Sequence, residues 1–238
     1  MALGLSLGVL LAAQTDGSGS QRRTEIASTP LPAITVRRPA APAPYRVPKD
    51  ALRVSSSAEL VSVLRRRGRE DIVLEAGAYD HAGPFSNPHG HRLYAGRLGR
   101  AVLRAGIVLG ANDGPSGPVL RGIRFDVAQP AKTLHGAIVH VWGSARNARV
   151  LDTWLDGNGV VDAGMTVRQP EGFVARRIVA TGFRSYGVLV DPHESDYRAR
   201  SPYSLSDLNV SHVARPVPGS SNGTAEACLW LGSRGTVR

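Results

Sequence analysis

The fold is decided by residues 136–191, which contain Ala137-Ile-Val-His-Val-Trp142, Val150-Leu-Asp-Thr-Trp-Leu-Asp-Gly157 and Val174-Ala-Arg-Arg-Ile-Val-Ala-Thr181. Each stretch alternates apolar with polar residues and is bounded by glycine, asparagine, aspartate or proline, which is typical of short strands separated by turns. The same pattern of two short strands recurs along the chain. Recurrence of this kind indicates a repeat architecture.

Two sets of positions define the repeat. One set, with offsets of 31, 24 and 30 residues, is Ile123, Trp154, Ile178 and Leu208. The other, with offsets of 26, 23 and 41 residues, is Val141, Val167, Val190 and Leu231. Unequal offsets indicate a constant strand core with inserted loops, as in a solenoid. We therefore predict an all-β, right-handed parallel β-helix; a β-sandwich is the alternative, because its strands have similar spacing.

Length and composition fit one large β domain. The chain has 238 residues, of which 42% are hydrophobic, with 27 glycines and 16 prolines. Residues 1–13 match the apolar region of a signal peptide and are too short to span a bilayer, so a secreted or cell-surface protein is expected. Residues 14–50 are rich in Ser, Pro and Arg, which predicts a disordered linker. The β-helix domain is expected over residues 51–238.

A short helix precedes the first strand of this domain. Ser56 and Glu59 fit a capping box, and an apolar face is formed by Leu60, Val63 and Leu64. The strand Asp71-Ile-Val-Leu-Glu-Ala-Gly-Ala-Tyr79 follows. These features resemble the opening of the pectate-lyase-like right-handed β-helix superfamily, and the resemblance covers the chain from about Leu52 onward. It implies a β-helix with a capping helix, but selects no activity, because the superfamily contains lyases, hydrolases, epimerases, tailspikes and adhesins.

The charge of the chain favours an acidic partner. The net charge is +10, and all but two of the 29 basic residues are arginine. A uronate polysaccharide fits this charge, although an arginine-biased composition gives the same excess without any ligand. Nucleic acid is not expected, because only 5% of residues are aromatic and the arginines lack stacking platforms between them.

Alternation along the repeats predicts one outward column of polar and aromatic side chains. It places Trp142, Arg168 and Asp191 in line on neighbouring strands, about 4.8 Å apart. An aromatic platform, a cation and a carboxylate in line are the parts of a sugar-binding groove. His140 and Asp156 are further candidates for contact with the substrate. The alternative is that Arg168 and Asp191 form an ordinary ion pair across strands.

The loop Asp191-Pro-His-Glu-Ser-Asp196 carries the remaining candidates. Oxygens of Asp191, Glu194 and Asp196 can bind Ca²⁺, and the alternative is a solvated turn. A polysaccharide lyase needs a cation for enolate-like charge and a base; Arg168 fits the first role, and the candidates for the second are His193, His140 and Tyr197. A glycoside hydrolase needs two carboxylates, for which Asp191 is one candidate.

The sequence leaves two functions open. The first is a secreted carbohydrate-active or carbohydrate-binding β-helix that acts on an acidic polysaccharide. The second is a non-catalytic, adhesin-like surface β-helix. The chain lacks the motifs of polygalacturonase-like hydrolases and of pectate lyases, so the resemblance does not establish catalysis. Because Leu229-Trp-Leu231 is followed by no capping element, we also expect missing C-terminal turns or a partner chain over the open end.

Overall fold

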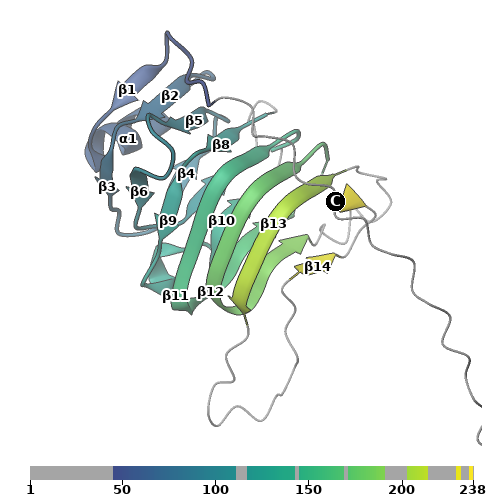
Figure 1. Cartoon of the computed structure of the whole chain (residues 1–238). Coiled ribbons are helices and arrows are strands. Elements are labelled where there is room, and N and C mark those ends of the chain that lie inside the picture. The colour runs from purple at the N-terminus through teal and green to yellow at the C-terminus, as the bar shows by residue number, and fades with distance from the viewer. Residues whose placement is uncertain are drawn as a thin grey trace, which may run out of the picture. The chain divides into compact units, whose positions relative to one another are not determined.

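The described part of the chain is mostly parallel β-sheet with few helices (Figure 1). The structure is a computed structural model. It describes residues 45–110, 117–142, 145–168, 171–190, 203–213, 229–231 and 236–237. These belong to one unit, Ala43–Arg238, whereas Met1–Pro42 lies outside the described residues. The parallel, β-rich part of the fold prediction is confirmed.

The strands pair in three parallel ladders, which we call A, B and C. Ladder A contains β1 (Leu52–Val54), β2 (Asp71–Leu74), β5 (Arg92–Ala95), β8 (Val119–Arg121) and β15 (Thr236–Val237). Ladder B contains β3 (Gly77–Tyr79), β6 (Ala101–Leu103) and β9 (Arg124–Asp126). Ladder C contains β4 (Phe85–Asn87), β7 (Ile107–Leu109), β10 (Ala137–Val141) and β14 (Leu229–Leu231).

Three long strands join these ladders. They are β11 (Arg149–Val167), β12 (Val174–Val190) and β13 (Ser204–Val213), which lie side by side in Figure 1. All three run through ladders A and B, and β11 and β12 continue into ladder C. From β2 onward the chain visits A, B and C in that order and then repeats the order.

The core lies on the inward side of each ladder. Side chains alternate across a strand, so every second position can be apolar and buried. Ladder A has one such column, all fully buried and in register: Ile72, Leu93, Leu120, Val150, Ala175 and Leu205. The buried apolar side chains of all three ladders form a single cluster, because each row of strands packs against the rows on either side of it.

One of the two predicted repeat registers is confirmed. The other is confirmed at Ile178 and Leu208 but is one residue off at Trp154. Val141, Val167, Val190 and Leu231 pair in ladder C as expected. In ladder B, however, the partner of Ile178 is Thr153, and Trp154 pairs with Val179. Thr153 is fully buried, and its hydroxyl is satisfied by a hydrogen bond that it donates to the carbonyl oxygen of Leu151 (2.8 Å). The alignment of Trp154 with Ile178 is therefore wrong by one residue, and the indole points outward.

The sequence also predicts Leu229-Trp-Leu231 as a core strand, but Leu231 is exposed. Its side chain is 37% exposed. Among the described strands, β14 pairs only with β12, so one side of this short strand has no neighbouring row to cover it.

A column of left-handed residues turns the chain from ladder A to ladder B. Each of these residues follows a position of ladder A that is in register with its neighbours, and each has a φ between 52° and 75°. They are Gly122, Asp152, Arg177 and Asp207. Aspartate and glycine adopt this conformation more readily than most residues. The corner therefore repeats at the same place in successive rows.

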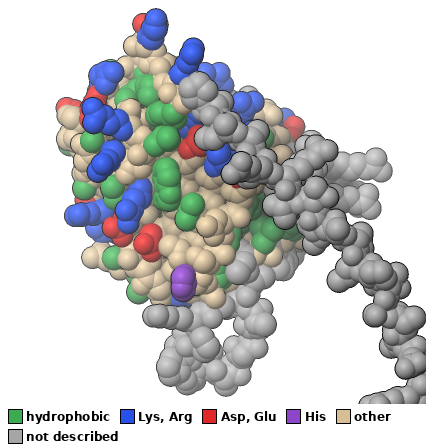
Figure 2. All heavy atoms as spheres, in the orientation of Figure 1, with side chains coloured by type: hydrophobic (Ala, Val, Ile, Leu, Met, Phe, Trp, Pro, Cys, Tyr) green, Lys and Arg blue, Asp and Glu red, His purple; other side chains and the backbone are tan. Residues whose placement is uncertain are grey.

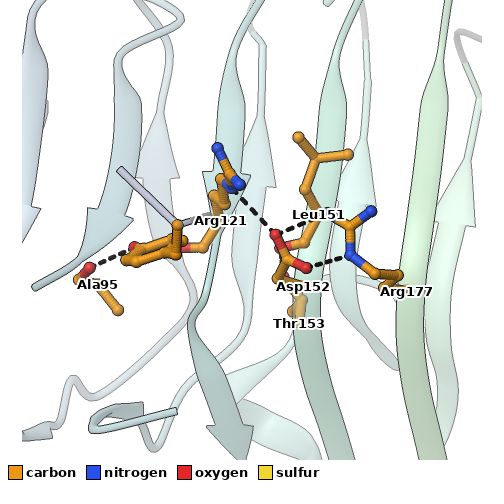
Figure 3. A network of polar contacts seen from close by, with 7 residues as sticks. Ala95, Arg121, Leu151, Asp152, Thr153 and Arg177 are labelled. Atoms are coloured by element: carbon orange, nitrogen blue, oxygen red, sulfur yellow. Dashed lines mark hydrogen bonds and ion pairs between the residues drawn. The ribbon is translucent and has the colours of Figure 1, made fainter. Parts of the chain in front are cut away.

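An ion-pair network holds this corner together (Figure 3). The Asp152 carboxylate accepts a hydrogen bond from Arg121 Nε (3.0 Å) and another from Arg177 Nη2 (2.9 Å). The guanidinium of Arg121 lies 5.0 Å from the ring centroid of Tyr45, whose hydroxyl donates to the carbonyl oxygen of Ala95. Tyr45, from the segment where the sequence predicts a linker, thus contacts ladder A.

The N-terminal helix forms where the sequence predicts it. It is α1 (Ser57–Leu64), and its buried face consists of Leu60, Val63 and Leu64. The Ser56 side chain accepts the N–H of Glu59 (3.3 Å), but the Glu59 carboxylate accepts the N–H of Ser55 (2.8 Å), one residue before the expected partner. A 3-10 turn, η1 (Pro130–Lys132), precedes β10. Within these described ranges, no helix is long and apolar enough to cross a membrane.

Replacing Ser56 with alanine is expected to lower the free energy of unfolding by about 1 kcal/mol, because the N–H of Glu59 loses its cap. Denaturant unfolding measures this change. Ser62→Ala is the matched control, since Ser62 is exposed inside the same helix and alanine favours helix there. Equal stability of Ser56→Ala and the wild type would show that the cap does not stabilise α1.

Candidate functional site

The candidate site lies on the outer face of ladder C, where β10 and β11 are neighbours. Val141 and Val167 are in register and buried, so alternation turns the residues that follow them outward. The N–H of Trp142 donates to Leu109 O (3.0 Å), and the N–H of Arg168 donates to Val141 O (2.9 Å). Trp142 and Arg168 therefore hold equivalent positions on neighbouring strands, about 4.8 Å apart.

Three aromatic rings gather at this face. The ring centroid of His140 lies 5.3 Å from that of Trp142 and 5.7 Å from that of His135. His135 and Trp142 are 6.3 Å apart. Trp142 keeps 38% of its surface exposed, so part of its indole is available to a ligand.

His135 was not among the residues singled out in the sequence. It lies in the turn before β10, where it has a left-handed φ of 48° and is followed by Gly136 with φ 73°. This turn places the imidazole beside His140 and Trp142. Strand alternation carries no signal for such a residue, because the position belongs to no strand.

His140 is enclosed by its surroundings. Its side chain is 1% exposed, and neither ring nitrogen has a hydrogen-bond partner within the described residues. Burial, with smaller contributions from His135 and Arg168, lowers the pKa of His140 from 6.5 to about 4. The ring is therefore neutral near pH 7. A base must reach the proton that it removes, and the role of His140 as base or substrate contact stays a prediction.

Arg168 supplies the positive charge of the site. It is half-buried at the end of β11, close enough to His140 to disfavour a second positive charge there. A half-buried guanidinium interacts more strongly with a carboxylate than a fully solvated one does, because water screens it less.

The loop candidates lie outside the described ranges. Asp191, His193, Glu194 and Asp196 belong to residues 191–202, as does Tyr197. The calcium site and the Arg168–Asp191 ion pair therefore remain predictions. Among the residues that the structure does describe, no group of three or more His, Cys, Asp or Glu side chains is placed to hold a metal ion.

Asp156 lies in a different ladder from Trp142 and Arg168. It pairs with Asp126 and Thr181 in ladder B, and its carboxylate accepts the N–H of Asn158 (3.0 Å). The structure thus brings together Trp142, His140 and Arg168 but not Asp156. The chain turns between ladders B and C, so the outer faces of these ladders are separate. Alternation of apolar and polar residues in the sequence does not reveal this turn, and it therefore predicts a single face.

Comparison with known proteins adds no assignment. No protein-family model, no curated protein and no solved structure matches the chain. The chemistry of its own residues is therefore what supports a function for this chain.

Proposed function

We propose that this chain is a right-handed parallel β-helix that binds an acidic polysaccharide on the outer face of ladder C. The repeated order of ladders A, B and C supports a coil in which each turn adds one row to all three ladders. The right hand follows from the strong preference of parallel crossovers for that hand. The helix α1, whose apolar face is buried, covers the first rows, as terminal units of a solenoid require.

The observation that carries the binding proposal is the exposed indole of Trp142 beside the cation of Arg168. An indole offers a flat apolar surface for the C–H face of a sugar ring. A guanidinium on the neighbouring strand is one strand spacing away, where it can pair with the carboxylate of a uronate unit in two parallel hydrogen bonds. The net charge of +10 attracts a polyanion from a distance.

The proposal is for binding rather than catalysis. A lyase needs a base in contact with the sugar, and the described candidate, His140, is enclosed. A secreted or cell-surface location belongs to the same proposal and is supported by the apolar residues 1–13. The adhesin-like structural role expected from the sequence is the outcome that remains if no polysaccharide binds.

Trp142→Ala and Arg168→Ala are each expected to weaken binding to polygalacturonate roughly tenfold, which corresponds to about 1.4 kcal/mol. The first variant removes the stacking surface and the second removes the charge. Affinity electrophoresis in gels that contain polygalacturonate measures the change.

Arg53→Ala is the charge-matched control. It removes one positive charge from an exposed pair with Glu75 at the edge of ladder A, away from the proposed face. Its binding is expected to stay close to that of the wild type. An equal loss in Arg53→Ala and Arg168→Ala would indicate a general charge effect and would overturn the assignment of the site.

A further inference from the structure

A second face of the sheet carries an unassigned depression. It has a volume of about 310 Å³ on the outer side of ladder B and is lined by Gly99, Arg124, Trp154, Asp156, Val179 and Thr181. We call it the Trp154 depression. Figure 2 shows hydrophobic side chains in a line down the face in view, with Lys and Arg side chains around it.

The register of ladder B builds this depression. Arg124, Trp154 and Val179 are paired in register, and so are Asp126, Asp156 and Thr181. Both sets point outward because the residues between them, Phe125, Leu155 and Ala180, are buried. The row that contains Trp154 and Val179 thus lies beside a row of hydrogen-bonding side chains. This second row is two residues further along each strand.

Gly99 keeps the side of the indole open. A Cβ atom at this position would lie 3.5 Å from Cζ3 of Trp154, in direct contact with its six-membered ring. Gly99 has a φ of 67°, a conformation that favours glycine. The turn therefore leaves beside the indole a space that most other residues would fill.

The depression is lined by charges of both signs. Arg124 is exposed and has no ion-pair partner in the described part of the chain, while Asp156, two residues after Trp154 on the same strand, is half-buried. Asp126 adds a second carboxylate, which accepts a hydrogen bond from Asn158 Nδ2 (2.9 Å). A polyanion would meet these carboxylates at close range, in contrast to the face with Arg168. Sugar hydroxyls suit the site, because they donate to carboxylates and accept from guanidinium and hydroxyl groups.

We propose that the Trp154 depression binds a neutral oligosaccharide, with one sugar ring stacked on the indole and its hydroxyls bonded to Asp156, Thr181 and Arg124. This site is separate from the acidic-polysaccharide face of ladder C and does not depend on it. A chain with both sites would hold a neutral and an acidic polymer at once, which raises its avidity for a matrix of the two.

The test is titration calorimetry of the full chain with xylohexaose and cellohexaose, with hexagalacturonate as the acidic probe. Binding of at least one neutral hexamer is expected, and Trp154→Ala should weaken it at least about tenfold. Thr181→Ala, which leaves the indole in place, should weaken it about threefold. Arg53→Ala, at the edge of ladder A and outside both proposed sites, is the control and should leave neutral binding unchanged.

Several results would overturn this inference. The first is that neither neutral hexamer binds. The second is that Trp154→Ala and Thr181→Ala bind the neutral hexamers as tightly as the wild type does. The third is that Trp154→Ala no longer binds hexagalacturonate. If Trp154→Ala does not fold, as judged by its unfolding transition, Thr181→Ala decides alone. Failure of the ladder C proposal would appear as unchanged hexagalacturonate binding in Trp142→Ala, so the two failures are distinguishable.

Discussion

Replacing Asp152 with alanine is expected to lower the free energy of unfolding by roughly 3 kcal/mol. The side chain of Asp152 is only 13% exposed and pairs with both Arg121 and Arg177. Its loss leaves two half-buried guanidinium groups facing each other without a counter-ion. Alanine is also disfavoured at the left-handed φ of 52° that this position requires. Urea unfolding of the purified variant measures the change.

Two variants separate these causes. Asp207→Ala has the same backbone conformation (φ 55°), but its pair with Arg176 is solvent-exposed; we expect a loss of roughly 1 kcal/mol, mostly from the backbone. Asp152→Asn tolerates the left-handed conformation and removes only the charge, so its loss should lie between the other two. Equal losses in Asp152→Ala and Asp207→Ala would contradict a special contribution of the buried network.

The pH dependence of this network has a defined sign. Burial alone would raise the pKa of Asp152, but hydrogen bonds from Arg177 and Arg121 outweigh it and hold the pKa below the usual 3.8. The contribution to stability is therefore complete above pH 3.8 and is lost as the pH falls through the lower folded-state value. The network does not account for any loss of stability between pH 7 and pH 5.

The stability of the wild type is expected to fall as the pH is lowered from 6.5 toward 4, and His140→Leu should remove much of that fall. His140 has a pKa of about 4 in the folded chain against 6.5 ordinarily. Between pH 6.5 and pH 4 the His140 imidazole is therefore protonated in the unfolded chain but neutral in the folded chain. This difference in bound protons favours unfolding. Between pH 7.5 and pH 5.0 the loss of stability amounts to roughly 2 kcal/mol.

Urea unfolding at pH 7.5 and pH 5.0 tests this prediction. His135→Leu is the matched control, because His135 is the exposed neighbour of the same ring. It should retain most of the acid sensitivity of the wild type. Parallel pH profiles for the wild type and His140→Leu would show that this buried imidazole does not govern acid stability.

The repeat could be predicted from the sequence wherever apolar alternation was uninterrupted. Val141, Val167 and Val190 lie in clean alternating segments, and their register is as predicted. The alternation breaks at Asp152 and Arg177, where a left-handed residue turns the corner and shifts the inward positions. The alignment therefore set Trp154 at a repeat position that belongs to the buried Thr153.

The candidate site could be predicted only in part for a related reason. The neighbourhood of Trp142 and Arg168 follows from alternation. The burial of His140 does not, because it depends on His135, a turn residue, and on the packing of Trp142 over the ring. The network of Asp152 joins residues 25 and 31 positions apart, which become neighbours only once the register of the rows is known.

Titration calorimetry of the wild-type chain with hexagalacturonate, and with a neutral galactose hexamer of the same length, at low and at high salt is the most direct test of acidic-polysaccharide binding. We expect hexagalacturonate to bind more tightly than the neutral hexamer and to weaken markedly as salt screens the arginine charge. Absence of hexagalacturonate binding at low salt, or equal and salt-independent binding of the two hexamers, would contradict the proposed function of the ladder C face.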